Sequence, residues 1–447
     1  MPPSASRSAL PCLLALAVLP ALAWGQTSST STAPALPASR PVSRPATQPA
    51  PPASRPFTRP ATQPVELAIT AGPVLGARGD DYITVSCRTN LPATVTLRIV
   101  GGVADPNATT DAERQNLLWH ETADTSPLGL HHQFRVSGLT GLVSAAYQLE
   151  GQSPTPPSIA GAGPSSLMPL PIAPDPLRFV VLGDVRTNPP DWPMVAMAVL
   201  KARPHFLVFV GDLIEPVRQN PNWPREYLDT ASTLLATVPS FVAPSQIRRD
   251  PPVAGLFAPP PDATPARWQQ TVGPVHLIGI DAQADWSPAS ANVAWLEGAL
   301  AESRSGFLFL ITRYPPRPAI SRDTLKALMP LLARHHATAV IAGQDRPYER
   351  TKDPSGVSVI NIAGDPFPPP APVPLDQAMD PSVPLTSPAA QYCLFTVDAG
   401  TCTMIVTTPD DRELDSCSWP SRPEAPPAPP PTTSPADESL TTPPTGQ

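Results

Sequence analysis

Proline constrains the fold of this chain more than any other residue type, because it has a fixed φ angle and no backbone N–H. The sequence holds 69 prolines among 447 residues, about three times the average usage. They gather in residues 1–64, 153–176, 251–265, 366–388 and 420–447. Since central strands and helix interiors exclude proline, we expect folded blocks separated by proline-rich connectors.

The first 25 residues have the pattern of a signal peptide. Arg7 supplies positive charge ahead of a short apolar run at residues 10–22, and small residues that suit cleavage follow. The run is too short to cross a bilayer and no later stretch qualifies, so no transmembrane segment is expected. The sequence therefore predicts a protein that is secreted, periplasmic or held at the cell surface.

Four cysteines would remain after cleavage: Cys87, Cys393, Cys402 and Cys417. In an oxidising compartment they could form two disulfides, and the three pairings stay open. None lies in a Cys-x-x-Cys pair, which argues against a thiolate zinc site. The net charge of −7 argues against nucleic acid as a partner.

Residues 26–65 form a proline-rich linker with a 15-residue repeat, ASRPVSRPATQP at 38–49 and ASRPFTRPATQP at 53–64. Such a segment favours extended polyproline II, a semi-rigid spacer. Its arginines could contact a cell wall or another anionic surface, and a solvated stalk is the alternative. Residues 153–176 are predicted as a second linker, and residues 419–447 as a disordered tail.

Residues 66–152 predict a small all-β domain. Apolar and polar residues alternate at 82–89 and 93–100, and segments 131–136 and 145–149 suggest a closing pair of strands. Short alternating strands separated by turns favour an immunoglobulin or fibronectin type III β-sandwich.

Residues 177–418 predict an α/β domain. Continuous apolar strands at 177–182 and 206–210 enclose a helix at 194–202, which is a βαβ unit buried on both faces. Further strands are predicted at 275–280, 307–311, 339–341 and 357–362, helices at 291–303 and 323–335, and a terminal hairpin at 391–397 and 402–407.

Each strand of the βαβ unit ends in Gly-Asp, which gives Asp184 and Asp212. Ligands bind at the carboxyl edge of open parallel sheets, and a glycine lets the backbone approach them closely. The two carboxylates could share a metal ion, or else form salt bridges and helix caps.

The order of these and later motifs resembles the calcineurin-like metallophosphoesterases, in particular the purple acid phosphatase branch. The resemblance covers residues 66–418 and rests on FVVLGDVRTNP, PHFLVFVGDLIE, VPSFVAPSQIR, VHLIGIDAQ, NVAWLEGAL, FLFLITRYPPRP, TAVIAGQDRPYER and SVINIAGD. It implies a four-layer β-sandwich flanked by helices, preceded by a fibronectin type III-like domain. It also implies a phosphoester hydrolase with a dinuclear Fe, Zn or Mn centre.

The resemblance places two carboxylate ligands at Asp184 and Asp212, but it finds no histidine at any metal-ligand position. Where the family has other ligands, this chain has Arg186, Glu215, Gln246, Arg313, Gln344 and Arg346, and Ile247 takes the place of the catalytic histidine. Arginine stays protonated and offers no lone pair to a metal. The three arginines instead suit salt bridges to the acidic residues, or the binding of an oxyanion.

These substitutions favour a non-catalytic or impaired member of the fold that binds phosphate or another anion through Arg186, Arg313 and Arg346. The alternative is an active phosphomonoester hydrolase with a single Mg²⁺ or Ca²⁺, held by the oxygens of Asp184, Asp212, Glu215, Gln246 and Gln344. A structural cell-surface module on the proline stalk is the third hypothesis. No catalytic residue is assigned.

Overall fold

The structure is a computed structural model that describes residues 65–104, 117–172, 175–185, 191–214, 222–245, 255–314, 322–343, 348–362, 385–387, 391–398 and 400–423. The predicted signal peptide and nearly all of the first predicted linker lie outside these residues. Within them, no helix has both the length and the apolar character needed to cross a membrane.

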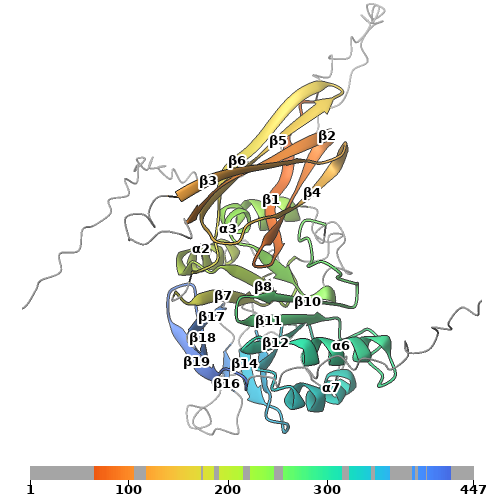
Figure 1. Cartoon of the computed structure of the whole chain (residues 1–447), viewed down its shortest axis with the longest axis vertical. Helices are drawn as coiled ribbons and strands as arrows, with labels where there is room; N and C mark the ends of the chain where they lie inside the picture. The colour runs from red at the N-terminus through yellow and green to blue at the C-terminus, as the bar shows by residue number, and fades with distance from the viewer. Residues whose placement is uncertain are drawn as a thin grey trace, which may run out of the picture. The chain divides into compact units, whose positions relative to one another are not determined.

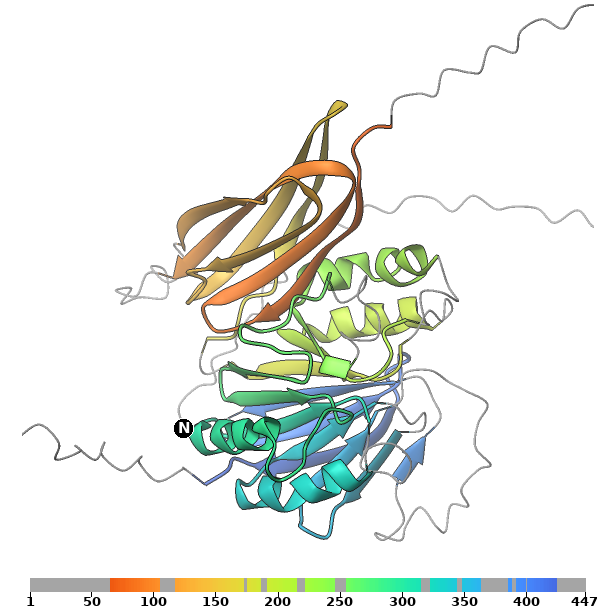
Figure 2. The same ribbon diagram turned by 90° about the vertical axis from the view of Figure 1, so that its right-hand side faces the viewer.

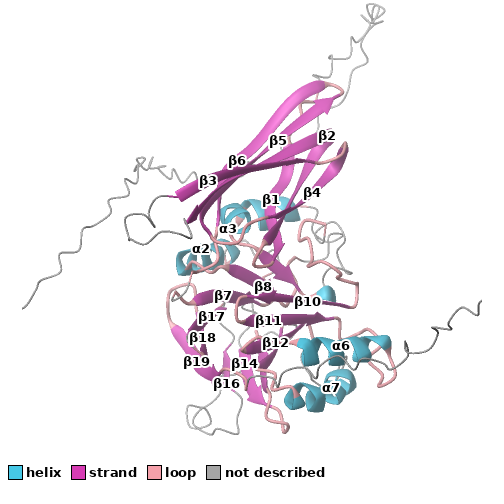
Figure 3. Cartoon of the chain, in the orientation of Figure 1, coloured by secondary structure: helices cyan, strands magenta, loops and turns pink. Residues whose placement is uncertain are grey.

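Strands make up most of the described structure (Figure 3). The strands are β1 (Ile69–Arg78), β2 (Tyr82–Ala104), β3 (Leu117–Thr125), β4 (Gly129–Ser137), β5 (Leu142–Pro154), β6 (Pro157–Leu167), β7 (Leu177–Leu182), β8 (Phe206–Phe209), β9 (Ser240–Val242), β10 (Arg267–Val272), β11 (Val275–Ile280), β12 (Phe307–Thr312), β13 (Ala339–Ala342), β14 (Tyr348–Lys352), β15 (Ser358–Asn361), β16 (Leu385–Ser387), β17 (Tyr392–Asp398), β18 (Thr401–Thr407) and β19 (Glu413–Pro420). The helices are α2 (Trp192–Ala202), α3 (Ser232–Thr237), α6 (Ala291–Glu302), α7 (Arg322–Arg334) and a π-helical turn at Pro224–Asp229.

One long strand, β2, organises the N-terminal β-region. Its first part pairs with β1 and β4, and its second part pairs with β3 and β5. Side chains from both parts, such as Val85 and Leu97, share one buried core with Phe134 of β4 and Leu149 of β5. The two predicted closing strands are confirmed as β4 and β5, but each pairs with β2 and no pairing joins the two in the described structure.

Part of the predicted second linker is a strand. β6 pairs with β5 from Pro154↔Pro157 to Ala145↔Leu167. β6 is the outer strand of its sheet, and an edge strand tolerates proline because one side of its backbone needs no partner. The prediction of a linker at residues 153–176, which rests on their proline content, therefore ends the β-domain too early.

Residues 177–420 contain two packed sheets covered by helices. One sheet has the order β19-β18-β17-β7-β8-β9 and the other β10-β11-β12-β13-β15-β14-β16. Aromatic and aliphatic side chains fill the space between the sheets, with Phe179 stacked on Phe395 at 4.6 Å between ring centroids. Helices α2 and α3 cover the outer face of the first sheet, and α6 and α7 cover that of the second (Figures 1 and 2). The result is a four-layer α/β fold.

The strands predicted in this region are confirmed. β7 and β11 have the expected bounds, β8, β12 and β13 differ from them by one residue at one end, and β15 is one residue shorter at each end. The predicted helices appear as α2, α6 and α7. The terminal hairpin is β17–β18, and its turn uses Gly400 at φ 97°.

The predicted disordered tail begins too early. Trp419 and Pro420 belong to β19, and the following segment is anchored by Ser421 N–H to Gly400 O (2.7 Å) and Arg422 N–H to Gly306 O (2.8 Å). The Arg422 guanidinium donates to Ser303 O (2.9 Å) after α6 and to His335 O (3.2 Å) after α7. A cation that binds free carbonyls at two helix C-termini fixes this segment to the fold.

The four cysteines of the described residues are free thiols in the structure. Cys87 lies in the core of the N-terminal β-region, whereas Cys393 and Cys402 lie in the core between the two sheets. Cys417 is half-buried beside that second core.

Candidate functional site

The carboxyl ends of the parallel strands form one edge of the α/β region. In the first sheet β7, β8 and β9 run parallel, and in the second β11, β12, β13 and β15 do. The two edges touch at glycines. A Cβ on Gly211 would collide with the Asp184 carboxylate, and a Cβ on Gly343 would lie 2.7 Å from Gly211 N. Only glycine permits this approach, which explains the Gly-Asp pattern after β8.

Asp184 and Asp212 lie together at this edge, as the sequence predicts. Both are buried, with 1% and 3% of their surface exposed. The Asp212 backbone N–H donates to Asp184 Oδ1 at 2.7 Å. The first carboxylate therefore orients the turn that carries the second.

Arg313 follows β12 and reaches across to the first sheet. Its Nη2 forms an ion pair with Asp212 Oδ1, and its Nη1 donates to Tyr314 Oη at 3.2 Å. The side chains of Arg313 and Asp212 are 4% and 5% exposed, so the ion pair is shielded from water. In a site with so little water, a charge pair is costly to break.

Three further buried polar side chains belong to the same edge. Ser245 lies past β9, Thr312 ends β12, and Gln391 precedes β17, whose Cys393 pairs with Val181 of β7. Within the described structure, Ser245 Oγ, Thr312 Oγ1, both polar atoms of Gln391 and Arg313 Nε have no hydrogen-bond partner. Buried polar atoms without partners are rare and often mark a site for water or a ligand.

Sequence reasoning missed Gln391, Ser245 and Thr312. Their strands are separated by long stretches of sequence, and only the sheet order brings them together. A polar residue directly beside a predicted buried strand is the signal that could have found them. Six residues of the sequence hypothesis, Arg186, Glu215, Gln246, Ile247, Gln344 and Arg346, lie outside the described residues.

The described part of this edge does not fit a dinuclear metal centre. No group of three or more His, Cys, Asp and Glu side chains there is placed to hold a metal ion. Asp212 is instead paired with Arg313, whose fixed positive charge opposes a cation at that carboxylate. The arrangement suits anions better, since a buried arginine donates well to oxyanions.

No family model and no curated protein matches the chain. Among solved structures, it resembles a purple acid phosphatase from yellow lupin (Lupinus luteus) seeds, with TM-score 0.61 and 14% identity over 77% of this chain and 73% of the lupin chain. GAP50 of Plasmodium, described as the anchor in the inner membrane complex, gives TM-score 0.43 and 17% identity over 56% and 90% of the chains. Vps29 from Entamoeba histolytica gives 0.27 and 10% over 55% and 99%.

Of these three structures, the lupin enzyme is similar enough to carry an argument about the fold. The α/β region, with its paired sheets and flanking helices, has the metallophosphoesterase fold of purple acid phosphatase. At 14% identity the likeness establishes the fold and leaves the activity open.

Proposed function

We propose that this chain is an exported protein of metallophosphoesterase fold that binds a phosphate-type oxyanion at its carboxyl edge and does not hydrolyse phosphoesters. The observation that carries the proposal is the buried ion pair between Arg313 and Asp212. In the resemblance Asp212 is the carboxylate that bridges two metal ions. A guanidinium in contact with it provides a permanent positive charge without Lewis acidity.

The anion would bind through donors of this edge. Arg313 Nε is buried and has no hydrogen-bond partner in the described structure. Gln391 Nε2 and the hydroxyls of Ser245 and Thr312 are also buried there without a hydrogen-bond partner. Arg186 and Arg346, which the resemblance places at the same edge, would add charge. Export is supported by the signal-like pattern of residues 1–25.

Metal content and hydrolysis together test this proposal. The purified chain should contain no stoichiometric Fe, Zn or Mn, and it should not turn over 4-nitrophenyl phosphate when Fe, Zn, Mn, Mg or Ca is added. Inorganic phosphate should raise its melting temperature. A paired variant, Asp212→Asn with Arg313→Met, removes both charges at once and should remove most of the phosphate-induced shift.

Stoichiometric metal together with turnover that is lost in Asp212→Asn would overturn the proposal in favour of an active hydrolase. A melting temperature that does not respond to phosphate, in the wild-type chain and in the variant alike, would leave the structural module as the remaining hypothesis.

A further inference from the structure

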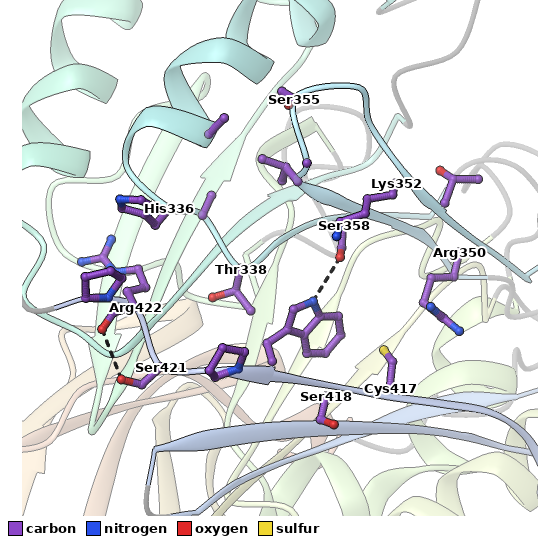
Figure 4. A pocket seen from close by; sticks show the side chains of 18 residues that line it. His336, Thr338, Arg350, Lys352, Ser355, Ser358, Cys417, Ser418, Ser421 and Arg422 are labelled. Atoms are coloured by element: carbon purple, nitrogen blue, oxygen red, sulfur yellow. Dashed lines mark hydrogen bonds between the residues drawn. The ribbon is translucent and has the colours of Figure 1, made fainter. Parts of the chain in front are cut away.

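A cavity lies at the opposite edge of the sheets from the carboxyl-edge site, where the parallel strands begin. It has a volume of about 640 Å³ and is bounded by the residue before β13, the start of β15, the end of β19 and the turn after α7. We call it the amino-edge pocket (Figure 4). It shares no residue with the carboxyl-edge site.

The charge of the amino-edge pocket is one-sided. Its lining includes His336, Arg350, Lys352 and Arg422, and no Asp or Glu is among the described residues that line it. Figure 4 shows His336 and Arg422 at one end and Arg350 and Lys352 at the other. Such a field attracts anions into a concave site.

Only part of this charge is neutralised within the protein. Arg350 forms a two-point ion pair with Asp415, at 2.6 Å from Nε and 2.9 Å from Nη2. Arg422 donates to neutral acceptors, the carbonyls of Ser303 and His335. Lys352 is exposed and makes no ion pair in the described structure. Lys352 and Arg422 therefore leave positive charge available at both ends.

His336 occupies a backbone position that normally selects glycine. Its φ is 52°, and His336 N–H to Ala333 O (3.0 Å) with Ala337 N–H to Leu332 O (2.9 Å) closes the end of α7. Glycine is usual at this position of such a helix end, and another residue there costs energy. The His336 side chain is exposed and lines the pocket.

The floor of the pocket contains a fixed aromatic ring. Trp419 Nε1 donates to Ser358 Oγ at 3.0 Å, which links β19 to β15, and Phe395 stacks on the indole with 6.3 Å between centroids. Trp419 lines the pocket and is half-buried. A ring held this way offers a flat surface at little entropic cost on binding.

We propose that the amino-edge pocket binds a small organic oxyanion, a phosphate or sulfate ester, with its charged group on Lys352 at one end and its ring or apolar body on Trp419, while His336 and Arg422 add to the positive field from the other end. This inference does not depend on the proposed function at the carboxyl edge. Because the site is open to solvent, each charged contact contributes modestly and added salt weakens it.

Calorimetric titration of the full chain with phenyl phosphate and with inorganic phosphate, at low ionic strength, tests the proposal. The background is Asp212→Asn with Arg313→Met, which removes the charge pair of the carboxyl edge. In this background, phenyl phosphate should still bind to the amino-edge pocket, and it should bind more tightly than inorganic phosphate. Lys352→Ala should weaken this binding about fivefold. The control Lys201→Ala, which removes an exposed lysine of α2, should leave the binding unchanged.

Two further variants locate the ligand without risk to folding. His336→Gly suits the left-handed backbone and should be at least as stable as the parent, yet bind phenyl phosphate about twofold to fivefold more weakly. Trp419→Phe keeps a flat ring and should keep most of the binding, but the change in tryptophan fluorescence on binding should disappear.

The proposal fails if Lys352→Ala and Lys201→Ala bind alike, or if the fluorescence change survives in Trp419→Phe. It also fails if the background variant no longer binds phenyl phosphate, since the anion would then belong to the carboxyl edge. Equal affinity for inorganic phosphate and phenyl phosphate would exclude the role given to Trp419.

Discussion

The two edges of the α/β region treat positive charge in opposite ways. At the carboxyl edge, Arg313 is buried and paired with Asp212. At the amino edge, Lys352 and Arg422 line an open pocket without an acidic partner in the described structure. In the fold shared with the lupin enzyme, ligands are expected at the carboxyl ends of the strands. Among the described residues, the arginine of the carboxyl edge is held in a closed ion pair, while the amino edge carries positive charge without an acidic partner.

Burial explains why the same residue type behaves differently at the two edges. A charge shielded from water must be paired, because the cost of removing its hydration is several kcal/mol. A charge at an open pocket stays hydrated and needs no partner within the protein, so it remains available to a ligand. The first arrangement contributes to stability when both partners are present, and the second is available for binding.

Removal of Arg313 alone should have the largest effect. Arg313→Met removes the cation that pairs with the buried Asp212 carboxylate, and the free energy of unfolding should fall by about 3–5 kcal/mol. Adding Asp212→Asn to this variant should restore most of the lost stability, because the buried carboxylate charge is then removed as well. Urea unfolding monitored by circular dichroism measures both.

The amino edge and the surface supply graded controls for that measurement. Arg350→Met breaks an ion pair whose arginine is 34% exposed, and Arg98→Met breaks one that is about half exposed on both sides. The loss in the free energy of unfolding should be smaller for Arg350→Met than for Arg313→Met, and smallest for Arg98→Met, at less than about 1 kcal/mol. If Arg313→Met proves as mild as Arg98→Met, the contrast between a sealed and an open edge is wrong.

Acid should weaken the protein through two histidines at the amino edge. His205 and His276 precede or begin strands β8 and β11 and are 8% and 4% exposed. Burial, with nearby arginines, lowers the pKa of each to about 4. The unfolded chain, with a histidine pKa near 6.5, therefore binds more protons between these values, so stability falls as the pH drops from about 6.5 to about 4.

Unfolding at pH 7.0, 6.0, 5.0 and 4.5 should show a loss on the order of 2 kcal/mol for each histidine by the lowest pH. His205→Gln and His276→Gln should each flatten the profile, and His120→Gln, on an exposed stretch of β3, serves as the matched control. A profile as steep in both variants as in the wild-type chain would show that these imidazoles are not kept neutral.

The sequence predicts the elements of the α/β region well because each strand there is a short apolar run with clear ends. Residues 177–182 of β7 and 275–280 of β11 match their expected bounds. It fails where pairing decides the structure. β6 was hidden by its prolines, and the segment after β19 is ordered by Arg422 binding to the ends of two helices.

The sites show the same division. Asp184 and Asp212 follow from local motifs, and the candidacy of Arg313 as a salt-bridge partner follows from the family resemblance. Gln391 does not follow from the sequence, because its place at the site depends on the pairing of β17 with β7. The amino-edge pocket does not follow from it either, because it depends on two sheets that meet at Trp419 and Ser358. Long-range pairing of this kind has no signature in a single sequence.

The smallest expected effect is a difference in thiol reactivity, which reports how open the amino edge is. Cys417 lines the amino-edge pocket (Figure 4), and burial raises its pKa to about 11. Cys402, with its pKa raised to about 12, and Cys393, raised well above the usual range, lie in the closed core between the sheets. Because the thiolate is the reactive form, all three should react slowly and Cys417 first.

Labelling of the folded chain with an aromatic disulfide reagent at pH 8, followed by peptide mass mapping, measures that order. Cys417 should be the first of the three to be modified, and phenyl phosphate should slow its labelling while leaving the rates at Cys393 and Cys402 unchanged. Simultaneous labelling of all three would indicate global opening of the fold rather than access through the pocket. If Cys417 is as protected as Cys393, the amino edge is closed in solution, and the contrast between the two edges lies in their charge alone.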